Sequence, residues 1–516
     1  FAKMVSSEAF LKSTLDFVSQ PLLALESRPE NAIAFLESID GIQSLLHAFA
    51  LEDIESSVRH DIARALSLVL STDLGRDALA SFPAVNQVLL AGLTNDNDFV
   101  RETTSAQILS LLNADYARFF PIISSPDLYR GLLVALGDEM TSVSEHVASI
   151  ILSLATSDEA FVDSFFFSSS SEVLQKFTTA DSTKLLRVHV LAARIGSLSD
   201  SAFECYKSSG YLKMALNLMR SDTDDILLQI SSLSILLEIA KSAPGLHYLV
   251  GIPLGELFNR YHRASNGPFT VVSALNILDG LVDQSMKHGI FDWLLHPGLR
   301  AFLTFSLHSE DESIEEAAIS ALSGIGKCFI GLETFCQNQD DLLPLIPKVL
   351  SRPHMPTNAL TVVSLHSLAT IFCTQYQGEE ARKADCHREF IIRGVVDPSD
   401  PQSDRNVSRF MSNVQKCCRN IDNDLRIAAY RFLGEFARSP FGLKAVLSTQ
   451  GFLQQLLDRS LEFNDKANLW RFAVVQTIST NPFLEGLVTS RVASNIRQHV
   501  QQGPYFQAHQ TQVVTL

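Results

Sequence analysis

Neighbouring cysteine and histidine residues are the first candidates for metal chemistry in this chain of 516 residues. A zinc site needs Cys or His ligands spaced so that both reach the same side of a loop or helix. Cys417 and Cys418 are directly adjacent, so on a helix their side chains would point about 100° apart. Cys386 and His387 have the same unsuitable spacing. We therefore expect structural or incidental cysteines and no metal site.

Other reactive groups also lack the spacing that catalysis requires. Gly324-Ile325-Gly326 has no following Lys and Ser/Thr and lies in an apolar run, which favours close packing over phosphate binding. His366 falls on an apolar helix face and is interpreted as a satisfied histidine rather than a general base. Glu315 and Glu316 are neighbours on a helix surface and do not converge as an acid–base pair. The sequence therefore predicts a protein that is not an enzyme and needs no cofactor, metal or small-molecule substrate.

Composition and charge narrow the class of protein further. An apolar content of 46% can bury a large core, which excludes disorder as the main state. The net charge of −16 argues against a binder of nucleic acid, which would need a basic face. No apolar run approaches the length of about 18 residues that a membrane helix requires. Seven thinly spread cysteines are typical of a reducing compartment, so we expect a cytoplasmic or nuclear protein that contacts neither nucleic acid nor membrane.

The sequence repeats with a period near 43 residues, and the helices of these repeats must position the side chains described above. In residues 58–70 the apolar side chains recur at steps of three and four, as in a helix with one buried face. The same pattern begins again at Val100, Val143, Leu186, Leu228, Thr270, Ile314, Ala359, Leu425 and Asn468. From Val58 onward the successive steps are 42, 43, 43, 42, 42, 44, 45, 66 and 43 residues. This period predicts an all-α, armadillo/HEAT-like superhelix, a solenoid of about ten repeats.

The segments between these copies favour the armadillo arrangement of helices. Polar turns, such as residues 95–98 and 422–424, precede the copies and can cap helix N-termini. Short segments that open on glycine, such as residues 245–249 and 442–447, follow several copies. Glycine there permits a tight chain reversal that a Cβ atom would obstruct. We therefore expect each repeat to contain a short helix, a second helix and a long third helix.

One solenoid is expected to span residues 5–502. One step between successive copies, from Ala359 to Leu425, is 66 residues long and leaves extra chain at 376–405. The polar composition and two prolines of that segment predict a mobile surface insertion. Residues 503–516 are predicted to form a frayed C-terminal tail. Residues 1–3 are interpreted as an addition ahead of a native start at Met4.

The long third helices should line the concave face of the solenoid, where such proteins bind their partners. Two positions four residues apart on each of these helices face inward in the armadillo pattern. The repeat register predicts a partner-binding face formed by Ser149, Ser153, Ser234, Glu238, Asn276, Ser320, Arg431 and Glu435. Gly280 and Gly324 occupy matching positions. For any one of these residues, simple solvation remains an open interpretation.

The composition of this face suggests the kind of partner. Nuclear-import armadillo proteins carry Trp and Asn at these positions to clamp an extended basic peptide. The chain has only two Trp, Trp293 and Trp470, and neither lies in the predicted ladder. A ladder of small and mixed polar residues suits a folded partner instead, and the net charge of −16 favours a basic patch on that partner.

Motifs in the last repeats resemble a known family. Ser439-Pro440-Phe441-Gly442 is followed by Gly451-Phe452-Leu453 and then by Asp458-Arg459-Ser460-Leu461-Glu462. After one more helix the sequence Gly503-Pro504-Tyr505-Phe506 closes the array. In this order and at this spacing the motifs resemble the proteasome non-ATPase regulatory subunit 5 family.

The resemblance implies a non-enzymatic chaperone for assembly of the base of the proteasome regulatory particle. Family members bind the C-terminal domain of a proteasomal ATPase subunit, beside other base subunits, and block premature docking on the core particle. The residues themselves leave a second function open, an armadillo-type protein-interaction scaffold or transport adaptor unrelated to the proteasome.

Overall fold

The structure, a computed structural model, describes residues 42, 45–46, 49, 56–167, 182–220, 225–262, 267–337, 342–350, 357–373, 376–393 and 403–506. All regular elements within these ranges are helices. The chain divides into two compact units, residues 1–221 and 222–516, and each unit is described by itself. The single solenoid over 5–502 stays a prediction. The predicted frayed tail over 503–516 is wrong for residues 503–506, which are held by a hydrogen bond from Arg459 to the Gly503 carbonyl oxygen. Residues 1–3 and 507–516 lie outside the described residues.

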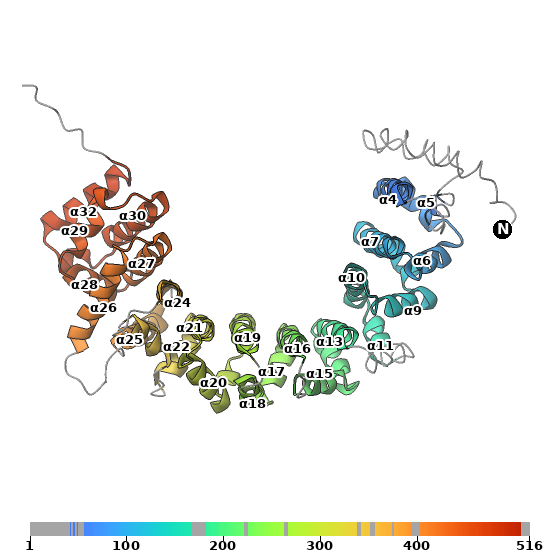
Figure 1. Ribbon diagram of the computed structural model, residues 1–516, viewed down its shortest axis with the longest axis horizontal. Coiled ribbons are helices and arrows are strands. Elements are labelled where there is room, and N and C mark those ends of the chain that lie inside the picture. The colour runs from blue at the N-terminus through green and yellow to red at the C-terminus, as the bar shows by residue number, and fades with distance from the viewer. Residues whose placement is uncertain are drawn as a thin grey trace, which may run out of the picture. The chain divides into compact units, whose positions relative to one another are not determined.

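The first unit repeats a pattern of short and long helices (Figure 1). Its long helices are α4 (Ser56–Ser71), α7 (Asp98–Ala114), α10 (Thr141–Ser157) and α13 (Ser182–Gly196). Its shorter helices are α5 (Asp73–Ala80), α6 (Val85–Leu93), α8 (Tyr116–Ile123), α9 (Pro126–Ala135), α11 (Glu159–Phe167), α14 (Asp200–Ser208) and α15 (Tyr211–Arg220). Each long helix packs against the next one, so α4, α7, α10 and α13 form a continuous row.

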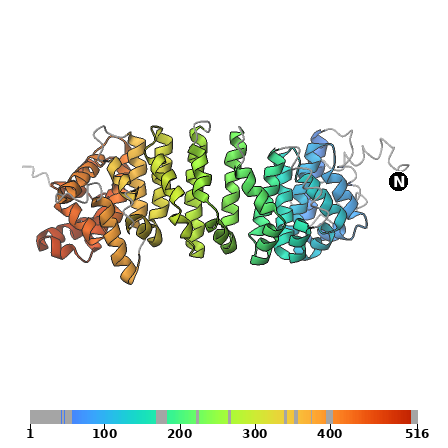
Figure 2. The same cartoon turned by 90° about the horizontal axis from the view of Figure 1, so that it is seen from below.

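The second unit continues the same pattern. Its long helices are α16 (Ile226–Ala240), α19 (Pro268–His288), α21 (Glu312–Gly326), α24 (Asn358–Cys373), α27 (Asn423–Phe436) and α30 (Asp465–Thr480). Its shorter elements are α17 (Ala243–Val250), α18 (Leu254–Asn259), η2 (Arg260–His262), η3 (Asp292–Leu295), α20 (Pro297–Leu307), α22 (Phe329–Gln337), α23 (Leu342–Val349), α25 (Gly378–Arg393), α26 (Ser403–Cys417), α28 (Pro440–Ser448), α29 (Phe452–Leu457), η4 (Arg459–Leu461), α31 (Leu484–Leu487) and α32 (Ser490–Gln502). Figure 2 shows the long helices of this unit side by side, and consecutive ones are in contact.

The predicted register agrees with these helices. Each of the ten copies begins inside a different long helix of the described chain, from Val58 in α4 to Asn468 in α30. Each long helix buries an apolar face, as α27 does with Leu425, Phe432 and Phe436. The all-α armadillo/HEAT-like solenoid fold is therefore confirmed.

Polar side chains start the long helices, as the turns predicted. The helix caps of α7, α16, α21, α27 and α30 accept a backbone N–H from the first turn through their side chains, and they are Asn97, Asp225, Asp311, Asp422 and Asn464. Such caps satisfy N–H groups that have no partner within the helix.

A recurrent glycine allows the short first helix to start directly beside the preceding long helix. It is the third residue of this helix in four repeats, at Gly75, Gly245, Gly331 and Gly442. A Cβ atom at Gly442 would lie 1.9 Å from the carbonyl oxygen of Phe436, and the other three positions show the same clash at 1.9–2.0 Å. The glycine is required for close approach, which confirms the reason inferred from the sequence.

The 376–405 segment differs from the expectation. Residues 378–393 form α25, which packs against α22 and α23 and buries Ala384, Arg388, Ile391 and Ile392. Helix α25 is the first helix of a regular repeat, extended to 16 residues where α28 has nine. The prediction of a mobile insertion is therefore wrong for residues 378–393, and residues 394–402 lie outside the described part of the chain.

Membrane-spanning length is reached by none of the described helices taken singly. Helices α21 and α22 reach it together, but the chain bends by 112° between them.

Candidate protein-interaction surfaces

The predicted ladder residues all lie on long helices. Ser149 and Ser153 are on α10, and the others are Ser234 and Glu238 on α16, Asn276 on α19, Ser320 on α21, and Arg431 and Glu435 on α27. Each of them is exposed or half-buried. The structure thus places them on helix surfaces, and their role in binding stays a prediction.

Two of the four serines of the ladder, Ser149 and Ser234, bond within their own helices. The Ser149 hydroxyl donates to the carbonyl oxygen of Glu145 at 2.9 Å, and the Ser234 hydroxyl donates to Ser231 at 2.6 Å. Because these hydroxyls are already bonded, they add little charge or directionality to the surface.

The acidic side chains of the ladder have basic neighbours. Glu238 pairs with Lys241 at the end of α16, and Glu435 pairs with Arg438 at 3.3 Å just after α27. Both acidic side chains of the ladder are therefore paired with a basic residue, so the negative charge of the chain is locally balanced at these positions. This arrangement suits polar recognition of a folded surface more than simple attraction of a polycation.

A histidine joins two neighbouring long helices at this surface. The Arg431 guanidinium of α27 lies 3.0 Å from Nδ1 of His366 on α24, so it donates a hydrogen bond that this nitrogen accepts. Burial, followed by the positive charge of Arg431, lowers the pKa of His366, and Asp424 opposes this shift. His366 is thus held neutral as a hydrogen-bond partner, as the sequence suggested.

The two glycines of the predicted ladder act as packing points rather than open positions. A Cβ atom at Gly280 would lie 2.7 Å from the Leu237 side chain of α16, and one at Gly324 would lie 2.0 Å from a carboxylate oxygen of Asp279. Burial raises the pKa of Asp279, although Lys327 nearby opposes that shift. The glycines therefore set how closely α16, α19 and α21 approach, which confirms the packing role inferred for Gly324.

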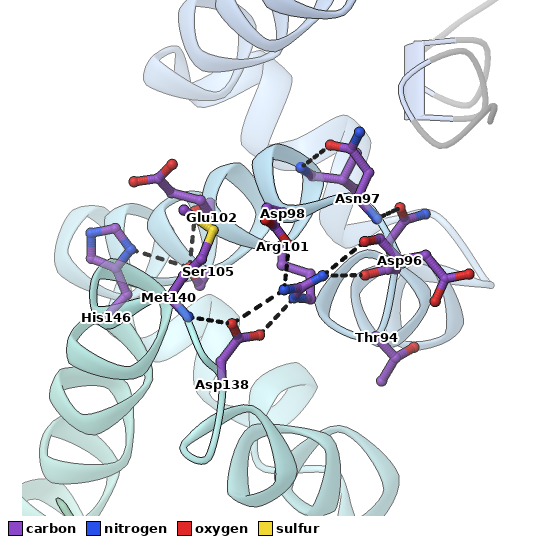
Figure 3. A network of polar contacts seen from close by, with 12 residues as sticks. Thr94, Asp96, Asn97, Asp98, Arg101, Glu102, Ser105, Asp138, Met140 and His146 are labelled. Carbon is purple, nitrogen blue, oxygen red and sulfur yellow. Dashed lines mark hydrogen bonds and ion pairs between the residues drawn. The ribbon is translucent and has the colours of Figure 1, made fainter. Parts of the chain in front are cut away.

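An arginine near the start of α7 ties two repeats together (Figure 3). Arg101 Nε lies 2.6 Å from one carboxylate oxygen of Asp138, and its Nη2 lies 3.2 Å from the other. Its Nη1 donates to the carbonyl oxygens of Asn95 and Asp96 in the turn before α7. Burial would raise the pKa of Asp138, but the hydrogen bonds from Arg101 and the Met140 N–H hold this pKa below its ordinary value.

The same arginine clamp recurs near the C-terminus. Arg426 on α27 donates from Nε and Nη2 to the two carboxylate oxygens of Glu462, each at 3.0 Å. Its Nη1 donates to the carbonyl oxygens of Asn420 and Ile421 at 2.7 and 2.9 Å. Sequence reasoning missed this clamp, although the residue after the first apolar position is Arg in several copies, as in Val58-Arg59 and Val100-Arg101.

A groove lies among the shorter helices α25, α26, α28 and α31. It has a cavity volume of about 600 Å³ and is lined by apolar side chains that include Met411, Phe441, Phe483 and Leu487. Arg393 of α25 stacks over the Phe441 ring at 5.4 Å. Phe441 belongs to the Ser439–Gly442 motif, but its contact with Arg393 of α25 can be identified only from the tertiary structure.

The thiols examined as metal ligands have no such environment. No group of three or more His, Cys, Asp or Glu side chains within the described ranges is placed to hold a metal ion. Burial raises the pKa of Cys417 to about 11 and raises that of Cys418 well above its usual range. Without a bound metal, these two neighbours are therefore neutral thiols at neutral pH.

Comparison with known proteins gives a family. The profile of the family described as "Proteasome non-ATPase 26S subunit" matches residues 83–385 and 411–515, which is more than half of the chain. A Bos taurus protein named 26S proteasome non-ATPase regulatory subunit 5 is 19% identical over 94% of this chain and 96% of its own length. The Homo sapiens protein of the same name is 19% identical over 81% of this chain and 80% of its own length. These matches confirm the resemblance seen in the C-terminal motifs.

Solved structures of other proteins show the same fold. Kap121p bound to Pho4p superposes with a TM-score of 0.54 at 13% identity, over 96% of this chain and 51% of that protein. Kap95p, in a structure that describes its binding to RanGDP, gives a TM-score of 0.52 at 12% identity, over 97% of this chain and 70% of that protein. At such low identity these likenesses establish the fold alone.

Proposed function

This chain belongs to the proteasome non-ATPase 26S subunit family, and we propose on this basis that it is an assembly chaperone for the base of the proteasome regulatory particle. It binds the C-terminal domain of a proteasomal ATPase subunit, in the presence of other base subunits, and prevents premature docking on the core particle. The proposal includes a non-enzymatic mode of action and a cytoplasmic or nuclear location.

The family match carries this proposal. It extends from the first unit to the last repeats, and the Bos taurus relative aligns over 96% of its own length. A row of long helices that exposes small and charge-paired side chains supports a folded domain as the ligand. Such a row can contact a folded domain over a broad area, whereas an extended peptide needs the ladder of Trp and Asn that is missing from the sequence.

The direct test is binding of the purified full chain to isolated C-terminal domains of the proteasomal ATPases. We expect a stable complex with at least one of these domains by size-exclusion chromatography. Adding purified core particle to the corresponding full-length ATPase should then give less docking when the chain is present. If none of the C-terminal domains forms a complex, the proposal fails.

Charge reversal on α27 tests whether the long-helix row is the binding face. Arg431→Glu and Glu435→Lys should each weaken the complex by about tenfold or more, because a partner surface matched to these charges then meets the opposite sign. Thermal unfolding should change only slightly, since both residues are partly exposed and each variant loses one polar contact, Arg431 with His366 or Glu435 with Arg438. The matched control reverses an exposed pair elsewhere, Glu485 and Arg497, whose charged atoms lie 2.7 Å apart. If reversal of Glu485 and Arg497 weakens the complex as much as reversal on α27, then α27 is not the specific binding face.

The alternative, a transport adaptor of the armadillo class, rests on fold likeness alone. It requires that an extended basic peptide bind the long-helix row. Fluorescence titration with such a peptide separates the two functions, and we expect no saturable binding.

A further inference from the structure

The turns before several long helices share one geometry. In each, a polar side chain accepts the backbone N–H of the residue two positions later, at 2.9–3.1 Å, and leaves one residue between them at the tip. The accepting residues are Asn95, Asp138, Asn420 and Glu462. The corresponding tip residues are Asp96, Glu139, Ile421 and Phe463. The tips are therefore charged in the first unit and apolar in the last repeats.

Three large apolar side chains follow one another at this position with a spacing of 42 residues, namely Ile421, Phe463 and Tyr505. They are 95%, 93% and 58% exposed. Tyr505 continues the series because the residue before it is bonded in an equivalent way. Asn468, the fourth residue of α30, donates to the carbonyl oxygen of Pro504, and Arg426, the fourth residue of α27, donates to the carboxylate of Glu462. Both pairs are 36 residues apart. We name these three residues the apolar edge.

The described part of the chain leaves Ile421 and Phe463 almost fully exposed. An apolar residue just before a helix cap usually packs against the fourth residue of the helix. In α27 and α30 that fourth residue is Arg426 and Asn468, both of which are polar. The same turn geometry is built elsewhere with Asp96 or Glu139 at the tip. Exposure of about 90% at Ile421 and Phe463 is therefore not a requirement of the turn.

The apolar edge is held in place on a rigid support. Arg426 donates to the carbonyl oxygen of Ile421 and also to the Glu462 carboxylate, so one guanidinium fixes two neighbouring turns. The closing segment is fixed by Arg459, which donates to the carbonyl oxygen of Gly503 and lies 5.4 Å from the centre of the Phe506 ring. A partner would thus meet a preformed row of side chains and lose little entropy in ordering it.

The spacing of the row matches an α-helix that lies across the repeats. Helices α27 and α30 pack against each other, and the axes of packed helices are typically about 8–10 Å apart. An α-helix rises about 1.5 Å per residue, so seven residues cover the same distance. A helix with apolar residues at every seventh position would therefore meet each member of the row.

The charges beside the row indicate the flanks of such a helix. Asp424 and Asp465, in the first turns of α27 and α30, are both exposed. They would attract Lys or Arg side chains next to the apolar stripe of a partner. Two copies of the apolar edge facing each other would instead bring these carboxylates together, which argues against self-association.

We propose that the apolar edge of Ile421, Phe463 and Tyr505 is a docking site for an amphipathic helix of a partner protein, with apolar residues at seven-residue spacing flanked by Lys or Arg. The site is separate from the long-helix row and does not depend on the proposed role in proteasome assembly.

A synthetic peptide tests the proposal with the full chain. The probe is a fluorescein-labelled helix of three heptads, with Leu at the first and fourth positions of each heptad and Lys beside them. We expect saturable binding by fluorescence anisotropy. A peptide of the same composition in scrambled order, and one with Glu in place of Lys, should bind about tenfold more weakly or not at all.

Variants of the chain show whether the peptide uses the apolar edge. The triple variant Ile421→Ser, Phe463→Ser, Tyr505→Ser should reduce affinity by about tenfold or more and leave thermal unfolding unchanged. The matched control, Phe269→Ser, removes a side chain that is 77% exposed on another repeat and should bind like the wild type.

Four results would overturn the proposal. The wild type could fail to bind the Lys-flanked peptide, the scrambled peptide could bind equally well, or the triple variant could keep full affinity. Sedimentation velocity gives the fourth, since self-association that disappears in the triple variant would identify a second copy as the occupant.

Discussion

Two glycines only eight residues apart should respond to alanine in opposite directions. At Gly442 the new Cβ atom would lie 1.9 Å from the Phe436 carbonyl oxygen, so the start of α28 has to move away. This movement breaks the 3.0 Å hydrogen bond from the Gly442 N–H to the Ser439 hydroxyl. Loss of such a cap costs about 1 kcal/mol. Overpacking adds about 1–3 kcal/mol, so we expect Gly442→Ala to destabilise α28 by about 2–4 kcal/mol.

At Gly434 the same substitution has room. The nearest atom to its Cβ would be Cγ2 of Val474, at 4.0 Å, which is an ordinary van der Waals contact. Gly434 lies inside α27, where alanine is favoured over glycine by about 1 kcal/mol. We therefore expect Gly434→Ala to stabilise the repeat, and it serves as the matched control.

Hydrogen exchange measured by mass spectrometry is the suitable assay, because a repeat array can unfold locally. A single unfolding midpoint for the whole chain would average the effect on α28 with all the other repeats. Since 1.4 kcal/mol corresponds to a factor of ten, amides of α28 should exchange about 30- to 700-fold faster in Gly442→Ala. Amides of α27 should exchange about fivefold more slowly in Gly434→Ala. Unchanged protection of α28 in Gly442→Ala would refute the close-approach argument, and equal losses in both variants would show a general intolerance of these helices.

Two further perturbations test buried polar groups. Arg426→Met leaves the Glu462 carboxylate, whose side chain is 2% exposed, without its ion-pair partner and should lower the free energy of unfolding by about 3 kcal/mol. Adding Glu462→Leu should restore part of this loss, because the double variant no longer buries an unpaired charge. Urea unfolding measures both variants, and losses that simply add would contradict the clamp. Burial lowers the pKa of His189 to about 4, so the unfolded chain, with an ordinary pKa near 6.5, takes up the proton first as the pH falls. Stability around α13 should therefore drop by about 2 kcal/mol between pH 7 and 5, and hydrogen exchange should show this dependence in the wild type but not in His189→Leu.

The long helices and their caps could be predicted because their signals are local. Val58–Leu70 repeats its apolar side chains at helical spacing, and Asp422 precedes α27 as a polar cap. Such patterns depend on neighbours within one or two turns, which a single sequence contains. The glycine at position 442 was also readable, because it follows the end of a long helix at a fixed distance.

Helix α25 was misjudged because its buried stripe is sparse and partly polar. Ala384, Arg388, Ile391 and Ile392 are spaced as on one helix face, but the segment has a strongly polar composition. Arg388 is buried through its stem, and its Nε donates to the carbonyl oxygen of Ile371. A buried arginine counts as polar in a sequence pattern, so the pattern predicts a loop where the structure has a helix.

The surfaces were harder to predict because exposure and approach are tertiary properties. Gly324 fits a ladder position by register, but the Asp279 carboxylate from the neighbouring helix fills the space beside it. Phe463 reads as an ordinary apolar residue before a helix, and only the structure shows that its side chain is 93% exposed. No local pattern distinguishes these outcomes.

The lengthened first helix has a consequence for how the array folds. Helices α24 and α27 pack against each other although their copies begin 66 residues apart instead of about 43. Closing the longer loop costs only about 0.4 kcal/mol more entropy, because this cost grows with the logarithm of loop length. The chain between two neighbouring long helices can therefore lengthen, here in both α25 and α26, at little cost in loop-closure entropy while the long helices keep their packing.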